Sequence, residues 1–120
     1  MSINEDIHKF ALKYYNMYTN PNAKEEDFFD GRKFIDECLE LNFKMDCGES
    51  FIEKYSAEIF NEVEEFEKII EEIADIKLLG SAIFSKWRYV THWSYNESLL
   101  DENNRRWFIL AFNRLAELTA

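Results

Sequence analysis

Residues 57–92, AEIFNEVEEFEKIIEEIADIKLLGSAIFSKWRYVTH, carry the most regular apolar pattern of the chain. The positions on this face advance by alternating steps of four and three residues, with one extra three-residue step between Ile73 and Ile76. They are Ile59, Val63, Phe66, Ile70, Ile73, Ile76, Gly80, Ile83, Trp87 and Val90. That spacing predicts helices that bury one face, as in a helical bundle. One long helix would fit the pattern, and so would two helices meeting near Ala74 and Asp75. Asp75 is a suitable N-cap, so a kink or break at that point is favoured.

Shorter patterns of the same kind flank this stretch. Ser2 and Glu5 form a capping box that opens a helix over residues 3–18, and Pro21 ends it. A second apolar face covers residues 31–42, and its end, residues 41–45, is interpreted as a frayed helix terminus. A last helix begins at about Glu102. The sequence therefore predicts one all-α domain over residues 1–120, a helical bundle of four to six helices with a long or kinked helix spanning 57–92.

Composition agrees with a helical domain that has one core. The 120 residues are 47% hydrophobic, with one proline and three glycines, which excludes a disordered chain and disfavours turn-rich β-sandwiches. No apolar run reaches the roughly 20 residues of a membrane span, and the first residues show no signal-peptide pattern. We therefore expect a cytoplasmic protein with no membrane partner.

Charge is concentrated in the middle of the chain. The net charge is −10, which argues against a nucleic-acid partner and favours a basic protein partner. On a helix over residues 62–75 the glutamates would face solvent, either as an ordinary solvated surface or as a docking surface for a basic partner. Lys68 would pair with Glu64 and Glu72 four residues away.

Short motifs with known chemistry are missing, which makes an enzyme the less favoured interpretation. There is no glycine-rich phosphate loop. The single E-x-x-H at Glu5–His8 is one of the two such motifs that a di-iron bundle needs, together with glutamates from two other helices. No metal, cofactor or catalytic residue is assigned. Cys38 and Cys47 are predicted to be buried thiols in a reducing compartment, with a disulfide left open.

A polar stripe on the 80–92 segment is the candidate site. On a helix, Ser81, Ser85, Arg88 and His92 share one face opposite the apolar one. Arginine and hydroxyl groups without a local acid suit a carboxylate or phosphate, and tyrosine and tryptophan suit a protein interface. The alternative is a solvated helix face. The candidate binding residues are Ser81, Ser85, Arg88, Tyr89, His92, Trp93, Arg105 and Arg106.

Two functions follow as expectations. The first is a small acidic protein-interaction or regulatory domain, such as a neutralising partner of a basic protein. The alternative is a ligand-binding or catalytic domain that holds an anionic small molecule in an arginine, histidine and aromatic pocket. The sequence fixes neither the ligand nor the oligomeric state.

Overall fold

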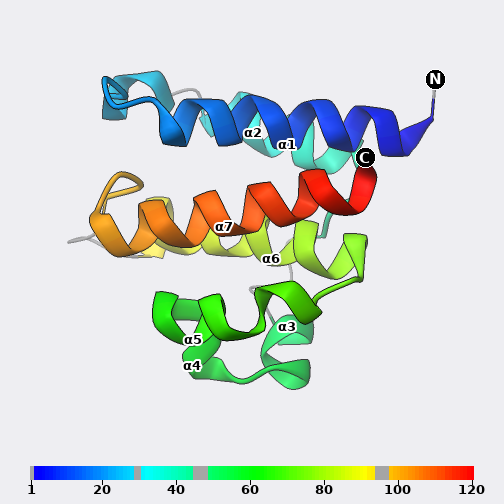
Figure 1. Ribbon diagram of the computed structural model, residues 1–120. Helices are drawn as coiled ribbons and strands as arrows, with labels where there is room; N and C mark the ends of the chain where they lie inside the picture. The colour runs from blue at the N-terminus through cyan, green and yellow to red at the C-terminus, as the bar shows by residue number, and fades with distance from the viewer. Residues whose placement is uncertain (1, 29–30, 45–48, 94–97) are drawn as a thin grey trace.

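The computed structural model describes residues 2–28, 31–44, 49–93 and 98–120 (Figure 1). These residues form seven α-helices, two 3₁₀ turns and one π turn, with no strand among them. The elements are α1 Ile3–Thr19, η1 Glu25–Phe28, α2 Gly31–Glu40, α3 Glu49–Lys54, α4 Ala57–Asn61, α5 Val63–Ile69, η2 Ile70–Glu72, α6 Ile76–Arg88, the π turn η3 Tyr89–Trp93 and α7 Glu102–Thr119.

The all-α, single-domain prediction is confirmed. The Cα radius of gyration is 13.1 Å, which matches the roughly 13–14 Å of one compact domain of this length. The helix number exceeds the predicted four to six because several helices are short. Within the described ranges, no helix is both long and apolar enough to cross a membrane.

The 57–92 segment is a chain of helices rather than one. The predicted break near Asp75 is confirmed: Ile73 leaves the helical conformation, and the Asp75 carboxylate accepts the Leu78 N–H at 3.0 Å. A second, unpredicted break lies at Glu62, whose extended backbone separates α4 from α5. The apolar phase continues across both breaks, so positions from Ile59 to Ile73 still face the core.

Two helix ends show how short sequences set the path of the chain. Ser2 Oγ accepts the Glu5 N–H at 3.2 Å, as the capping box predicts. The end of α2 is an ordered Schellman cap and not a frayed terminus. Asn42 has a φ of 64°, and the Phe43 N–H donates to the Cys38 carbonyl at 2.9 Å. This turn directs Phe43, which is 1% exposed, into the core.

The helices form layers around α6 and α7. α1 and α7 run antiparallel along one side, α2 lies behind α1, and α3 to α5 cover the opposite side of α6 and α7 (Figure 1). Because α6 contacts α2, α3, α4 and α7, every residue from Leu79 to Trp87 is buried. α6 is therefore a central helix, and its polar side chains lie inside the protein.

Candidate functional site

The first half of the polar stripe is buried. Ser81 is 9% and Ser85 2% exposed, so the expectation that these serines lie outside the core is wrong. The reason is that α6 contacts α2, α3, α4 and α7, so its polar face is covered by other helices and not exposed to solvent. Ser81 Oγ accepts the Lys44 N–H at 2.9 Å and thereby fastens the segment after α2 to α6. This bond gives Ser81 a structural role.

Lys86 is a buried polar residue that the sequence analysis did not select. Its side chain is 1% exposed, and Nζ donates to Asn61 Oδ1 at 3.2 Å. Nζ also lies 5.7 Å from the ring centre of Phe60 and 5.5 Å from that of Trp107, within cation–π range. These partners come from α4 and α7, so no local sequence pattern could reveal them.

The second half of the stripe reaches the surface on the π turn. A π turn holds more residues than an α turn, so residues after Arg88 leave the α-helical register. Tyr89 is 38% exposed and His92 is exposed, whereas Arg88 is half-buried. The buried Nε of Arg88 has no hydrogen-bond partner among the described residues. The Trp93 side chain lies outside what the structure describes.

Arg105 and Arg106 bind neighbouring helices. Arg105 donates from Nε to the Tyr18 carbonyl at 2.8 Å and from Nη2 to the Asn20 carbonyl at 2.7 Å. These bonds cap the C-terminus of α1, where unpaired carbonyls and the helix dipole favour a cation. Arg106 pairs with Glu67 at 2.9 Å and Glu64 at 4.0 Å. Both arginines therefore have partners that account for their place in the first turn of α7.

Trp107 is a core residue and offers no surface to a ligand. It is 0% exposed and stacks on Phe66 with ring centres 4.5 Å apart. Its Nε1–H donates to the Ile59 carbonyl at 3.4 Å. Packing against Phe66 of α5 thus covers the aromatic face of Trp107.

The acidic surface is the array of exposed carboxylates on α4, α5 and η2. It consists of Glu58, Glu62, Glu64, Glu65, Glu67, Glu71 and Glu72. The expectation that these side chains face solvent is confirmed. Lys68 pairs with Glu65 at 3.2 Å, three residues away, and not with the two predicted glutamates four residues away.

A hollow of about 640 Å³ lies on this acidic surface. Its lining residues are Ser56, Glu58, Ile59, Glu62, Glu64 and Glu65. Glu58 and Glu62 form no ion pair with any described residue. Ser56, at the edge, has φ 145° and ψ 162°, a backbone region that is essentially confined to glycine. The hollow thus combines unneutralised charge with local backbone strain.

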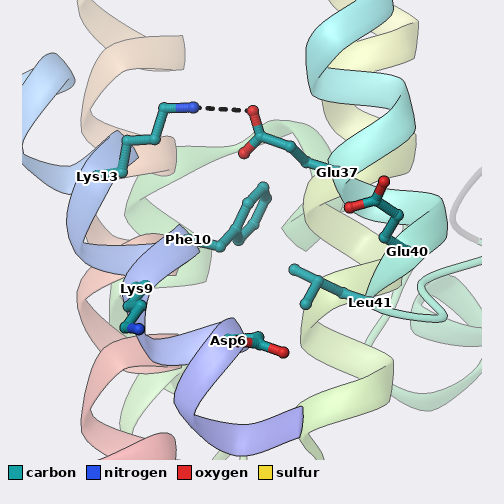
Figure 2. A pocket seen from close by; sticks show the side chains of 7 residues that line it. All are labelled: Asp6, Lys9, Phe10, Lys13, Glu37, Glu40 and Leu41. Carbon is teal, nitrogen blue, oxygen red and sulfur yellow. Dashed lines mark hydrogen bonds and ion pairs between the residues drawn. The ribbon is translucent and has the colours of Figure 1, made fainter. Parts of the chain in front are cut away.

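A second hollow separates α1 from α2 and has mixed charge (Figure 2). Its volume is about 400 Å³, and it is lined by Asp6, Lys9, Phe10, Lys13, Glu37, Glu40 and Leu41. Lys13 Nζ bridges to Glu37 Oε1 at 2.8 Å, and the Tyr14 hydroxyl donates to the same oxygen at 3.1 Å. These bonds join α1 to α2. Because acidic and basic side chains both line this hollow, it favours neither an anion nor a cation.

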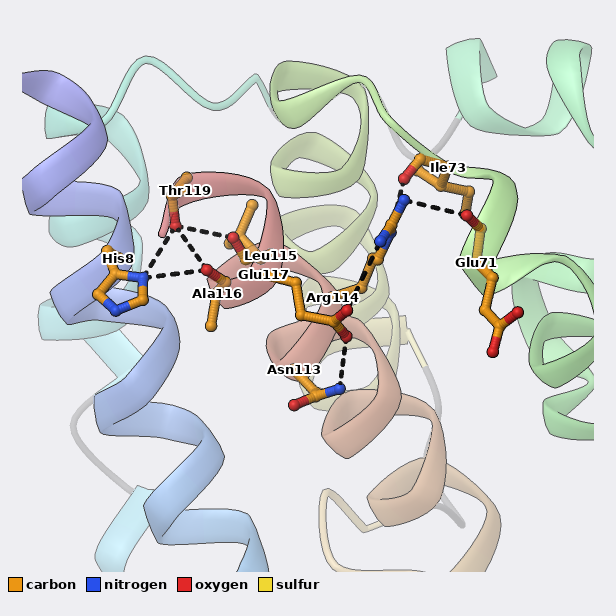
Figure 3. A network of polar contacts seen from close by, with 9 residues as sticks. All are labelled: His8, Glu71, Ile73, Asn113, Arg114, Leu115, Ala116, Glu117 and Thr119. Carbon is orange, nitrogen blue, oxygen red and sulfur yellow. Dashed lines mark hydrogen bonds and ion pairs between the residues drawn. The ribbon is translucent and has the colours of Figure 1, made fainter.

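The histidine and thiol candidates have structural surroundings. His8 Nδ1 lies 3.0 Å from the Ala116 carbonyl and 3.2 Å from Thr119 Oγ1, which links α1 to α7 (Figure 3). The described ranges contain no group of three or more His, Cys, Asp or Glu residues that could hold a metal ion.

Cys38 is a buried free thiol. Burial, followed by the charge of Glu37, raises the pKa of this thiol far above its ordinary value. Such a thiol is a poor nucleophile. Cys47 lies outside the described residues.

Comparison with known proteins returned no family model, curated protein or solved structure that matches this chain. The chain's own surface is therefore the ground for a functional proposal.

Proposed function

We propose that this chain is a protein-interaction domain that binds a lysine- and arginine-rich segment of a partner through the acidic surface. The observation that carries the proposal is the hollow of about 640 Å³, because four glutamates line it and two of them, Glu58 and Glu62, have no ionic partner among the described residues. Glu58 and Glu62 line the same hollow, so their like charges repel each other, and a bound cation would reduce that repulsion.

Other features of the acidic surface also suit a partner with long basic side chains. Ile59, 9% exposed, adds an apolar contact for the methylene stem of a long basic side chain. Arg106 supplies an internal example on the acidic surface, since its guanidinium pairs with Glu67 and Glu64. The predominantly negative charge of the acidic surface raises the association rate of a basic partner and makes the affinity depend on salt. Neutralising a basic protein is one regulatory role that this binding would serve.

The test compares two variants that remove the same charge from different places. Glu58→Gln/Glu62→Gln removes two carboxylates from the hollow, whereas Glu26→Gln/Glu102→Gln removes two exposed carboxylates elsewhere. The probe is a fluorescein-labelled octapeptide of alternating lysine and arginine, followed by anisotropy at about 20 and about 150 mM NaCl, where the Debye lengths differ by more than twofold.

We expect the hollow variant to weaken binding about tenfold, because two exposed ion pairs are together worth roughly 1.4 kcal/mol. The control variant should stay within about twofold of the wild type, since both variants change net charge equally. Equal losses in the two variants would show that net charge alone attracts the peptide. Absence of binding by the wild type at low salt would refute the proposal.

A further inference from the structure

Arg88 differs from the other four arginines in its surroundings. Arg32 pairs with Asp36 at 3.3 Å, and Arg105 and Arg106 have the partners given above. Arg114 donates from Nε to the Ile73 carbonyl at 2.9 Å and from Nη2 to the Glu71 carbonyl at 3.0 Å (Figure 3). The Arg88 side chain makes no hydrogen bond or ion pair with a described residue, although its Nε is fully covered.

The helix dipole does not offset the cost of burying the Arg88 Nε–H without an acceptor. A cation near the C-terminus of a helix is stabilised only weakly by the helix dipole. A buried N–H without an acceptor costs more than this gain, and the cost is larger when the group is charged. The chain has 24 acidic and 14 basic residues, yet no described carboxylate lies within ion-pair distance of Arg88. An internal structural role therefore does not account for the guanidinium at this position.

The surroundings of Arg88 suit a ligand from solvent. Arg88 is the last residue of α6, and the π turn that follows presents Tyr89 and His92 at the surface. π turns occur frequently at functional sites. Because Nε is covered, an incoming ligand would meet the Nη1 and Nη2 end, where the planar fork matches two oxygens of one group.

We propose that Arg88 binds a carboxylate or phosphate oxyanion at the exposed end of α6, with Tyr89 and His92 beside it. The oxyanion would supply the negative charge that no described residue places within ion-pair distance of Arg88. This site has the opposite charge to the acidic surface and stands independently of the proposed function.

The first test observes the five arginine Nε–Hε groups in ¹H–¹⁵N correlation spectra. The protein is titrated with sodium phosphate, sodium acetate or sodium chloride at constant ionic strength. We expect a saturable shift of the Arg88 signal with phosphate or acetate and no saturable shift with chloride. The signals of Arg105 and Arg114, whose Nε groups already donate to carbonyls, should not move. The oxyanion that saturates at the lower concentration identifies the preferred chemistry.

The second test separates binding from folding. Phosphate or acetate should raise the melting temperature of the wild type by mass action. Arg88→Gln should lose that increase while melting at or above the wild-type temperature without the anion, because the unpaired charge is gone. Arg88→Lys keeps the charge without the fork and should bind at least about tenfold more weakly. Glu58→Gln/Glu62→Gln should leave the Arg88 response unchanged, which separates this site from the acidic surface.

Two results would overturn the proposal. One is an Arg88 signal that moves linearly and equally with all three salts, which is the behaviour of ionic screening. The other is an Arg88→Gln variant that melts well below the wild type and still gains the same stability from phosphate. That result would make Arg88 a structural residue.

Discussion

Gly80→Ala should destabilise the protein although alanine is the better helix former. A Cβ atom at position 80 would overlap the Phe43 ring at Cδ1, Cε1 and Cζ, deep inside van der Waals contact. The ring is held in place: Phe43 is 1% exposed, its N–H is bonded in the Schellman cap, and its ring centre lies 5.9 Å from that of Phe10. The next residue, Lys44, is fixed to Ser81 by its own N–H.

The magnitude follows from two opposing terms. Overpacking a core costs about 1–3 kcal/mol, and three overlapped carbons of an enclosed ring indicate the upper end. Replacing glycine by alanine in a helix interior returns about 1 kcal/mol. The net loss should be about 2 kcal/mol. For a domain of about this size, that lowers the melting temperature by roughly 8 °C.

A double-mutant cycle tests the cause of this loss. Phe43→Ala alone should cost about 3–5 kcal/mol, and urea unfolding measures the free energy of each variant. In the Phe43→Ala background the overlap is gone, so Gly80→Ala should become stabilising by up to about 1 kcal/mol. The same loss from Gly80→Ala in both backgrounds would refute the reasoning, because the ring would then not be the obstacle.

Three further changes have defined outcomes. Ser56→Gly should stabilise the protein by about 1 kcal/mol in urea unfolding, because glycine adopts a φ of 145° without strain. Ser56→Ala should give no such gain. If Ser56→Gly also gives no gain, the strain is absent. Arg105→Gln should lower the free energy of unfolding by about 1.5–3 kcal/mol, because the carbonyls at the end of α1 lose their hydrogen-bond donor. The adjacent Arg106→Gln should lower it by less than about 1 kcal/mol, because the ion pairs of Arg106 are exposed. Equal losses would argue against the capping role of Arg105. Because the pKa of Cys38 is raised in the folded protein, the unfolded chain releases the thiol proton at lower pH. The stability that the protonated thiol contributes is fully present below about pH 8.5. It is lost as the pH rises further, at up to about 1.36 kcal/mol per pH unit. Urea midpoints from about pH 8 to pH 10 should therefore fall less steeply in Cys38→Ala than in the wild type, and identical slopes would contradict a buried thiol.

Local patterns predicted the helices because the physics of helix ends and faces is local. Ser2 and Asp75 cap their helices as expected, and the apolar steps from Ile59 to Ile73 identify buried positions. The break at Glu62 carries no such signal, because glutamate is neither a preferred cap nor a helix breaker.

The candidate site was harder to predict because burial depends on distant partners. The helical spacing placed Ser81 and Ser85 opposite the apolar face, but it could not show that other helices cover that face. Arg105 and Lys86 find their acceptors on α1 and α4, far away in sequence. The sequence could single out Arg88, but only the partners of the other four arginines show that its lack of a partner among the described residues is unusual.

The pairing of α1 with α7 has a consequence for synthesis on the ribosome. The apolar face of α1, with Phe10, Ala11 and Tyr14, is covered mainly by a helix that begins only at Glu102. Translation adds about 5–20 residues per second, so α1 waits on the order of seconds for its neighbour. During that interval the face is open to chaperones and to nascent copies of the same chain. Contacts between segments so distant in sequence also slow folding, which lengthens the exposure.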